Sequence, residues 1–482
     1  MSQLLEQPTT DEVAGAAPST LRRTAPVWLA IVAASLPMFM STLDNLVMTS
    51  ALPVIQAELG ASVEELQWFI NAFTLAFASF ILMAAALGDR IGRRTVFMVG
   101  IGVFTLASVY SALSVESWQL ILGRAVQGVG AAAIMPLSLT LLVGSVSARM
   151  RPLAIGIWGG VSGLGVAVGP LVGGAVVEGW NWQSIFWINV PVGLIAIPLA
   201  IAALPNTFGA RLRADIVGLL LAGVGVLGLV YGIVRGNDAG WDSLEVIGSI
   251  GVGAVLLVAF VIWEGRTPTP LLPLRLFRDR SFSVANVVGL VFSFGVFGSI
   301  FILIQFMQIV QGLSPLEAGV RTMPWTMAPM VIAPLAGLIA PRVGTRALIV
   351  VGLTMQAAAM FWLGAILSAD VAYLEMLTPF ILAGVGMGLV FAPMSTAVLA
   401  TMRSDDQAKA SGTNSTLREI GVALGIAVLT AVFVGLGGEL TPTGYVDAAG
   451  PAVLVGAAAL AAAALLALIL PAGRSARAQS AG

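Results

Sequence analysis

The sequence contains no cysteine and no histidine among its 482 residues. Without cysteine, the chain can form no disulfide, no thiolate nucleophile and no thiolate metal site. Without histidine, proton exchange near neutral pH must use another group, and a carboxylate shielded from water is the candidate that remains. Lysine is almost absent as well: Lys409 is the one lysine in the sequence, and the other 22 basic residues are arginines. Together with abundant alanine and glycine, this bias is typical of a GC-rich bacterial genome.

The composition is that of a membrane protein. Hydrophobic residues make up 58% of the chain and charged residues 10%, whereas a soluble domain carries about 25% charged residues. Apolar runs of about 20 residues recur along the whole sequence, and each can cross a hydrocarbon layer of roughly 30 Å as a helix. The net charge of −1 gives no indication of nucleic-acid binding. We therefore expect an all-α polytopic membrane protein.

Fourteen apolar segments are predicted to span the membrane, and an even number places both termini on one side. The segments are approximately 27–49, 67–87, 96–114, 118–144, 154–177, 182–204, 216–235, 245–263, 282–310, 318–340, 347–368, 375–400, 411–435 and 450–470. The first 26 residues are polar and lack the apolar core of a signal peptide. We expect them to form a disordered cytoplasmic tail.

The arginines test this topology. With the N-terminus in the cytoplasm, 19 of the 23 basic residues fall in cytoplasmic segments. Only Arg235 and Arg321 fall near the outer face, and Arg124 and Arg418 lie within apolar segments. Such an excess of positive charge on one side is the rule for cytoplasmic loops, and a missed helix would scramble it. The pattern predicts a multi-pass protein of the bacterial cytoplasmic membrane with both termini inside.

An internal repeat indicates how the segments are grouped. The stretch AALGDRIGRR at 85–94 aligns without gaps with GLIAPRVGTR at 337–346, so that Arg90 matches Arg342 and Gly92 matches Gly344. Repeats of this kind are typical of secondary transporters with a binding site between two halves. We predict a tail at 1–26, a six-helix bundle at 27–204, two extra transmembrane helices at 205–263, a cytoplasmic linker at 264–281, a second six-helix bundle at 282–470 and a tail at 471–482. The linker either lies on the anionic inner leaflet or is a solvated tether.

One predicted membrane helix is unusually rich in helix-weakening residues. Gly159–Gly174, GGVSGLGVAVGPLVGG, contains seven glycines and Pro170. Glycine costs a helix about 1 kcal/mol and an interior proline about 3. Gly165, Gly169 and Gly173 recur every four residues and form one smooth ridge. The stretch is either a closely packed helix of the GxxxG kind or a bendable helix at a moving contact between two halves of a transporter.

Six motifs in the predicted order resemble the major facilitator superfamily, and specifically its fourteen-helix drug:proton antiporter branch, the QacA/EmrB-like multidrug exporters. They are LDNLVMTSALP at 43–53, GDRIGRR at 88–94, GRAVQGVGAA at 123–132, GVAVGPLVGG at 165–174, WNWQSIFWINVPVG at 180–193 and PLLPLRLFRDRSF at 270–282. The resemblance covers nearly the whole chain, although Ala85 replaces the usual opening glycine of the second motif. It implies the major facilitator fold, with two six-helix bundles and two extra central helices.

Asp44 lies within the first predicted helix. A charge at the bilayer centre costs about 2.5–3.5 kcal/mol on insertion scales, so an acid there is a functional candidate. The resemblance gives this residue a role in proton coupling and in substrate binding, whereas a structural, hydrogen-bonded Asp44 is the alternative. Arg124 and Gln127 share one face of the fourth predicted helix. Arg124 cannot lose its proton and would serve either as a fixed counter-charge in coupling or as a structural group.

Arg418 and Glu419 lie within the thirteenth predicted helix, with Asn414 one turn before Arg418. Neighbouring residues do not share a helix face, so we expect them to pair with other helices. The branch more often has Gln at the position of Glu419. Glu419 is therefore either a second proton or cation site or a locally neutralised structural charge, and we include both residues among the candidates for proton coupling.

Two further groups of residues are candidates for gating and for substrate binding. The loop charges lie too near water to bind substrate and help to set the topology; the resemblance adds a role in gating between the halves. The candidates for gating are Asp89, Arg90, Gly92, Arg93, Arg94, Gly165, Gly169, Pro170, Gly173 and Gly174. The candidates for substrate binding are Asp44, Asn71, Gln127, Gln305 and Gln308.

The sequence thus predicts a proton-coupled efflux antiporter that exports amphipathic or cationic small molecules by alternating access. It contains no P-loop, so we expect the proton gradient to supply the energy and no cofactor, metal or enzymatic activity. The expected partners are a small-molecule substrate, protons and the lipid bilayer, with the chain acting as a monomer. A dedicated exporter of one self-made metabolite or lipid is the alternative, and a membrane receptor that does not transport is a third.

Overall fold

The computed structural model describes residues 26–147, 150–209, 215–399, 402 and 407–471, and all regular secondary structure in these ranges is helical. The predicted tails lie mostly outside the described residues. The helices are α1 (Val27–Leu59), α2 (Val63–Ile91), α3 (Arg93–Ala112), α4 (Ser117–Ser145), α5 (Arg151–Gly179), α6 (Ser184–Trp187), α7 (Asn189–Ala203), α8 (Ile216–Ala239), α9 (Leu244–Glu264), the 3-10 helix η1 (Leu274–Arg278), α10 (Arg280–Ile309), α11 (Pro315–Val343), α12 (Thr345–Ile366), α13 (Tyr373–Leu399), α14 (Gln407–Gly435) and α15 (Pro442–Ala467).

The expected membrane helices are present. In the described ranges, thirteen segments are long and apolar enough to cross a membrane, with α6 and α7 together forming one of them, Ser184–Ala203. The 29-residue α5 occupies the place of the remaining predicted span. Several helices are longer than the apolar runs predicted, and α1 continues ten residues beyond residue 49. Apolar length underestimates these helices because their polar ends extend beyond the hydrocarbon layer.

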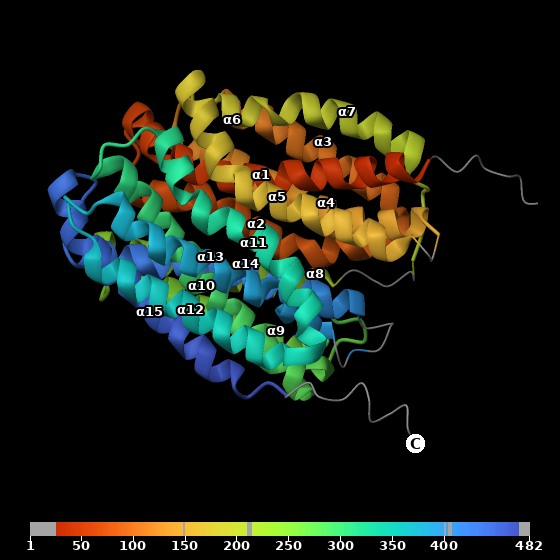
Figure 1. Ribbon diagram of the computed structural model, residues 1–482. Helices are drawn as coiled ribbons and strands as arrows, with labels where there is room; N and C mark the ends of the chain where they lie inside the picture. The colour runs from red at the N-terminus through yellow and green to blue at the C-terminus, as the bar shows by residue number, and fades with distance from the viewer. Residues whose placement is uncertain (1–25, 148–149, 210–214, 400–401, 403–406, 472–482) are drawn as a thin grey trace, which may run out of the picture.

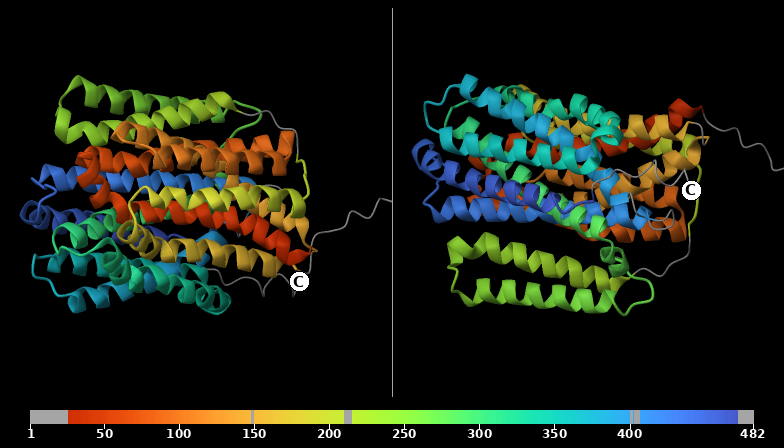
Figure 2. Two further views of the ribbon diagram at one scale, coloured as in Figure 1. Left: turned by 90° about the horizontal axis from the view of Figure 1, so that it is seen from above. Right: turned by 60° about the horizontal axis from the view of Figure 1, so that its bottom comes forward.

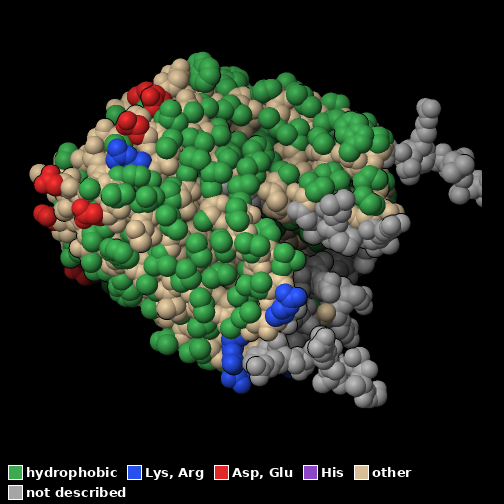
Figure 3. Space-filling model, in the orientation of Figure 1, with side chains coloured by type: hydrophobic (Ala, Val, Ile, Leu, Met, Phe, Trp, Pro, Cys, Tyr) green, Lys and Arg blue, Asp and Glu red, His purple; other side chains and the backbone are tan. Residues whose placement is uncertain are grey.

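The helices run side by side along one axis, and charge separates the two ends of the molecule. The start of α1 and the end of α15 lie at the same end of the molecule (Figure 1). We call this end, which holds Arg94 and Arg346, the basic end, and the opposite end, which holds Glu65 and Glu317, the acidic end. Acidic side chains gather at the acidic end and hydrophobic side chains cover the surface between the ends (Figure 3). That surface is the one expected to face lipid.

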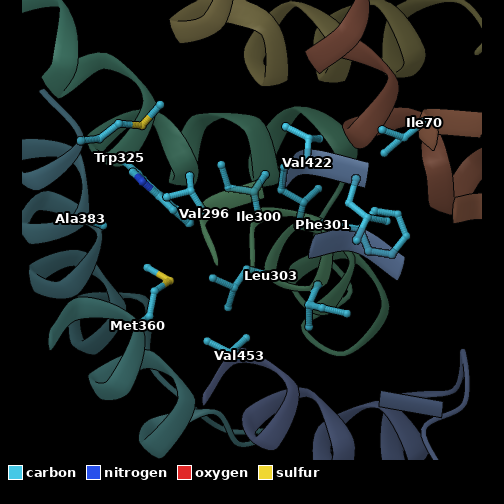
Figure 4. Close-up of a cluster of buried hydrophobic side chains, with 14 of the residues drawn as sticks. Ile70, Val296, Ile300, Phe301, Leu303, Trp325, Met360, Ala383, Val422 and Val453 are labelled. Atoms are coloured by element: carbon cyan, nitrogen blue, oxygen red, sulfur yellow. The ribbon is translucent and has the colours of Figure 1, made fainter. Parts of the chain in front are cut away.

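Most helix contacts fall within two groups. Helices α1 to α7 pack among themselves, and α10 to α15 do the same. The groups meet where α5 packs against α11 and α2 against α14, with a smaller contact between α1 and α10. One continuous apolar core joins them, in which Ile70 of α2 lies on the side of Phe301 and Val422 (Figure 4).

The internal repeat has matching local geometry. Ser62 and Glu65 form a capping box that begins α2, and Ser314 and Glu317 form the same box, 252 residues later, at the start of α11. Both helices have 29 residues and end at a glycine in the left-handed region, Gly92 with φ 115° and Gly344 with φ 95°. An L side chain rarely adopts such a φ, so glycine is required at both turns.

The repeat extends to a long-range contact. Arg94 Nη1 donates to the Leu204 carbonyl oxygen at 2.9 Å, at the end of the first group of helices. Its counterpart Arg346 donates through Nη1 to the Leu470 carbonyl oxygen at 3.4 Å, at the end of the second group. Each arginine therefore satisfies a carbonyl at a helix terminus that has no partner in its own helix.

The glycine ridge of α5 faces α1. A Cβ at Gly169 would lie 2.6 Å from Leu46 Cβ, and one at Gly173 would lie 2.8 Å from the Val47 carbonyl oxygen. Gly165 faces Thr42 of α1 in the same way. The ridge thus serves close packing within the first group of helices, as a GxxxG pattern does.

The contact between α5 and α11 uses different residues. A Cβ at Gly174 would clash with the backbone of Pro315, and one at Gly319 would lie 3.0 Å from Leu171 Cα. Ser50 Oγ of α1 donates a hydrogen bond to the Pro170 carbonyl oxygen at 3.2 Å. Backbone therefore meets backbone at the acidic end, whereas Gly160 of α5 and Gly337 of α11 have no described atom within 4 Å of a Cβ position.

The extra helices α8 and α9 form a hairpin on one side of the molecule (Figure 2). Val226 and Val230 of α8 pack with Leu75 of α2 and Ala423 of α14, so α8 covers a line where the two groups meet. Helix α9 is mostly exposed and apolar, as expected for a surface in contact with lipid. The linker after α9 is not a loose tether throughout, because Leu276 of η1 is buried.

We predict that substitutions on the two faces of α5 have different effects. Gly169→Leu overpacks the α1–α5 contact and should lower stability by about 1–3 kcal/mol. Gly174→Leu touches only the α11 backbone, so it should obstruct closure at the acidic end and impair transport with little loss of yield. Thermal unfolding in detergent and transport in vesicles measure both effects. Gly160→Leu, which points into open space, is the matched control; equal loss of stability in Gly169→Leu and Gly174→Leu would contradict the division.

Candidate functional site

Asp44 lies at mid-helix in α1, between Pro37 and Pro53, and only 4% of the residue is exposed. Its carboxylate is fully engaged. Oδ2 pairs with Nη1 of Arg124. Oδ1 accepts hydrogen bonds from Gln127 Nε2 at 3.2 Å and from Asn189 Nδ2 at 2.7 Å. These three hydrogen bonds satisfy a carboxylate that is removed from water.

Arg124 of α4 is completely buried. Its Nε donates to the Phe69 carbonyl oxygen of α2 at 3.0 Å, and its Nη1 also donates to Gln127 Oε1 at 3.0 Å. The guanidinium carbon lies 4.5 Å from the centre of the Phe73 ring. Nη2 has no hydrogen-bond partner among the described residues. Arg124 is thus held in one position by contacts with three elements, as a fixed counter-charge must be.

Ser108 of α3 links the remaining members. Its Oγ accepts from Gln127 Nε2 at 2.8 Å and from Asn189 Nδ2 at 3.2 Å, and it donates to the Phe104 carbonyl oxygen at 2.8 Å. We call Asp44, Ser108, Arg124, Gln127 and Asn189 the Asp44 network. It draws side chains from α1, α3, α4 and α7, so the ion pair fixes the mutual positions of four helices.

The sequence motifs include Asn189 but give no reason to select it. A signal was present, because Asn189 is a strong hydrogen-bonding residue in the apolar run 185–204, and such residues inside membranes are expensive unless paired. It begins α7, immediately after the short helix α6. The break between α6 and α7 therefore positions the amide toward Asp44.

Arg418 and Glu419 occupy two different hollows. Glu419 lines a small cavity, which we call the Glu419 cavity, together with residues of α1, α2, α10 and α14: Asn45, Leu46, Thr49, Ile70, Phe297, Ile300, Phe301, Val422 and Ile426. Arg418 lines a recess of the second group of helices, the Arg418 recess, with Gly289, Phe292, Val390, Phe391, Met394, Ser395 and Asn414. No residue lines both.

From the sequence we expect Arg418 and Glu419 to pair with residues of other helices, and the contacts in the structure differ from this expectation. Arg418 contacts another helix through an aromatic ring, with its guanidinium carbon 4.8 Å from the centre of the Phe391 ring of α13. Its Nε and Glu419 Oε2 have no hydrogen-bond partner in the part of the chain that the structure describes. Neither residue forms an ion pair within these ranges. Asp44 and Arg124, by contrast, form an ion pair with each other.

The other candidates for substrate binding are dispersed. Asn71 is fully buried in α2, and its amide has no partner among the described residues. Gln305 Nε2 donates to the Phe301 carbonyl oxygen of its own helix at 3.1 Å. Gln308 Nε2 donates to the Ser50 carbonyl oxygen at 3.0 Å, which joins α10 to α1 at the acidic end. Gln127 belongs to the Asp44 network. None of the four lines the two hollows described above.

The loop charges bind within the first group of helices. Arg93 Nε pairs with Asp89 Oδ1 at 2.7 Å, and Arg94 reaches carbonyl oxygens at the end of α7. The Gly92 turn packs against the Asn206 amide. Arg90 is exposed and takes part in no ion pair among the described residues. Among the described residues, no ion pair joins this loop to the second group of helices.

The sequence matches known transport proteins. The model of the Major Facilitator Superfamily matches residues 29–426. The chain is 34% identical to the multidrug resistance protein Stp of Mycobacterium tuberculosis over 84% of this chain and 75% of that protein. It is 32% identical to the tetracenomycin C resistance and export protein of Streptomyces glaucescens, over 92% and 83% of the two chains. It is 34% identical to the cephamycin export protein CmcT of Amycolatopsis lactamdurans, over 93% and 94%.

Solved structures agree on the fold. A peptide transporter of the POT type superposes with a TM-score of 0.66 at 16% identity, covering 92% of this chain and 95% of that one. A bacterial homologue of the human lysosomal transporter Spinster, in an inward-facing conformation, superposes with a TM-score of 0.63 at 17% identity, covering 92% and 96%. At this level of identity the likeness concerns architecture alone.

We predict that the Asp44 network contributes strongly to stability. Arg124→Leu leaves the Asp44 carboxylate buried without its counter-charge and should cost about 3–5 kcal/mol. The double variant Asp44→Leu/Arg124→Leu removes both charges and should be more stable than Arg124→Leu alone. Asn189→Ala removes an amide that donates to Asp44 and Ser108 and should cost about 1–3 kcal/mol. Thermal unfolding of the purified protein measures all three. A double variant less stable than either single one would contradict this account.

Proposed function

The chain belongs to the Major Facilitator Superfamily, in the branch of its multidrug resistance and antibiotic export proteins, and on this basis we propose that it exports small molecules in exchange for protons. It is a multi-pass membrane transporter. The proposal concerns the ion and the mechanism: a proton gradient drives export of amphipathic or cationic molecules from the cytoplasm by alternating access. The observation that carries it is the buried Asp44–Arg124 pair, which places an ionisable carboxylate within a membrane helix.

The conformation supports alternating access with the basic end in the cytoplasm. Backbone contacts between α5 and α11, and the Gln308–Ser50 hydrogen bond between α10 and α1, close the acidic end. Toward the basic end, Gly160 of α5 and Gly337 of α11 have no described atom within 4 Å of a Cβ position, so this close backbone contact does not continue there. This is the arrangement expected of an inward-facing transporter, ready to accept substrate from the cytoplasm. On this proposal Asp89, Arg90 and Arg93 pair across the halves only in the opposite, outward-facing state.

Asp44 and Glu419 are the proposed proton carriers. Protonation of Asp44 removes the charge that holds Arg124, Gln127 and Asn189 together, and the helices they join are then free to shift. Arg124 stays charged throughout and serves as a fixed counter-charge. Glu419 faces α1 from α14, in a cavity that includes Asn45, the neighbour of Asp44. A cation entering this cavity would compete with a proton for the Glu419 carboxylate, and that competition is the coupling an antiporter needs.

Substrate-induced proton release distinguishes the two carriers. In a weakly buffered solution of the purified protein, a cationic dye such as ethidium should displace protons and lower the pH. Asp44→Asn should abolish this release, because an amide does not bind and release a proton near neutral pH. Glu419→Gln should lower the release. Glu375→Gln, an exposed acid at the acidic end, is the matched control. Release that survives undiminished in Asp44→Asn, or dye efflux that ignores collapse of the proton gradient, would overturn the proposal.

An exporter dedicated to one self-made metabolite is the second candidate function. Relatives named for a single antibiotic, tetracenomycin C or cephamycin, favour it, whereas Stp is named for multidrug resistance. Resistance profiling in a host that lacks its major pumps separates the two. Protection against several unrelated cations is the result expected for multidrug export. Protection confined to one compound would assign the dedicated function.

A further inference from the structure

We propose that the Arg418 recess binds the carboxylate of an aromatic substrate, so that the exporter accepts acidic or zwitterionic molecules as well as cations. The inference rests on the proposed export function and extends its range of substrates. The recess lies between α10, α13 and α14, and its polar lining residues are Arg418, Asn414 and Ser395. Its free volume is about 10 Å³, room for about one water-sized group, so it would receive only the charged end of a substrate and not a whole drug.

The first step of the argument is the charge of Arg418. A guanidinium cannot lose its proton and is costly within a membrane protein unless an anion compensates it. Arg124, the other arginine within a predicted span, has the Asp44 carboxylate. Arg418 has no acid within ion-pair distance among the described residues, and its Nε has no hydrogen-bond partner there. The neighbouring Glu419 interacts with Arg418 electrostatically, but it forms no ion pair with it and lines a different cavity, so the Glu419 carboxylate does not occupy the Arg418 recess.

The second step is the shape of the recess. Phe391 lies under the Arg418 guanidinium at 4.8 Å and meets Phe292 edge to face at 5.6 Å, so aromatic surface adjoins the charge. Asn414 Nδ2 donates one hydrogen bond to Asn286 Oδ1 at 3.1 Å. The same amide nitrogen carries a second hydrogen, which can form a hydrogen bond with an anion. A guanidinium, an amide donor and aromatic faces are the groups that recognise an aromatic carboxylate.

The third step is the space beside Arg418. A Cβ at Gly289 would lie 3.4 Å from Asn414 Nδ2 and 3.6 Å from Arg418 Cγ. Those are ordinary contact distances, so any larger side chain would extend into the recess itself. Glycine at this position leaves the guanidinium accessible from α10. The recess can therefore be blocked without removing its charge.

Two dyes that differ only at a carboxylate test the proposal. Rhodamine 110 has a free carboxylate, and rhodamine 123 is its methyl ester. The wild-type protein, in nanodiscs of phosphatidylcholine, should bind rhodamine 110 about tenfold more tightly than rhodamine 123. One charge-assisted, hydrogen-bonded pair is enough for a difference of this size. Arg418→Gln should remove this preference, and Gly289→Leu should remove it while binding of rhodamine 123 changes little. Fluorescence anisotropy gives the affinities. Arg321→Gln is the matched control, because Arg321 also stacks on a ring, that of Tyr373, but lies at the acidic end.

The outcomes separate this inference from the proposed function. Binding and proton-coupled efflux of rhodamine 123, without any preference for the carboxylate, would overturn the anion site and leave the proposed export intact. A preference that survives in Arg418→Gln or in Gly289→Leu would also overturn it. A preference that phosphatidylglycerol abolishes would assign the recess to lipid phosphate instead of substrate. Failure of the wild type to bind either dye would count against both proposals.

Discussion

The buried ion pair between Asp44 and Arg124 is the constraint on which the first group of helices depends. Two opposite charges removed from water must satisfy each other and the remaining donors and acceptors, because nothing in the hydrocarbon layer can do so. Gln127, Asn189 and Ser108 complete the set, and they bring α1, α3, α4 and α7 to one point. A proton that neutralises Asp44 would therefore act on the packing of four helices at once, which connects a local change of charge to a movement of the whole group.

Close backbone contact determines where the two groups of helices can meet. At the acidic end, Gly174 and Gly319 let α5 and α11 approach until their backbones touch, and a Cβ at either position would separate them. The ridge of Gly165, Gly169 and Gly173 instead holds α5 on α1. One helix thus packs on α1 with one set of glycines and on α11 with another. The close packing that its sequence suggests is present, and movement at the α11 contact stays a prediction.

The extra hairpin adds a connection between the groups that a twelve-helix arrangement would lack. Arg235 of α8 pairs with Glu64 of α2 at 3.0 Å, and Asn237 of α8 donates to the Ala431 carbonyl oxygen of α14. Helix α8 is therefore bonded at the acidic end to both groups. Any conformation that separates α2 from α14 there must break or rearrange one of these contacts, so the hairpin favours the closed acidic end.

The sequence by itself determined the membrane class, the number of helices, the family and the repeat, because these depend on apolar length, on the placement of arginine and on short motifs. Asp44, Arg124 and Gln127 could be selected from the sequence as candidate site residues, since polar groups are rare and costly in apolar segments.

The tertiary structure decided what each group contacts. It added Asn189 to Asp44, left Arg418 and Glu419 in separate hollows rather than in ion pairs, and bound Arg94 to α7. Val296, at the repeat spacing of 252 residues from Asp44, is a buried core residue, so the repeat alone does not place a second acid. Such contacts join residues far apart in the chain, and which of them form depends on how helices pack, a property that no local pattern of residues contains.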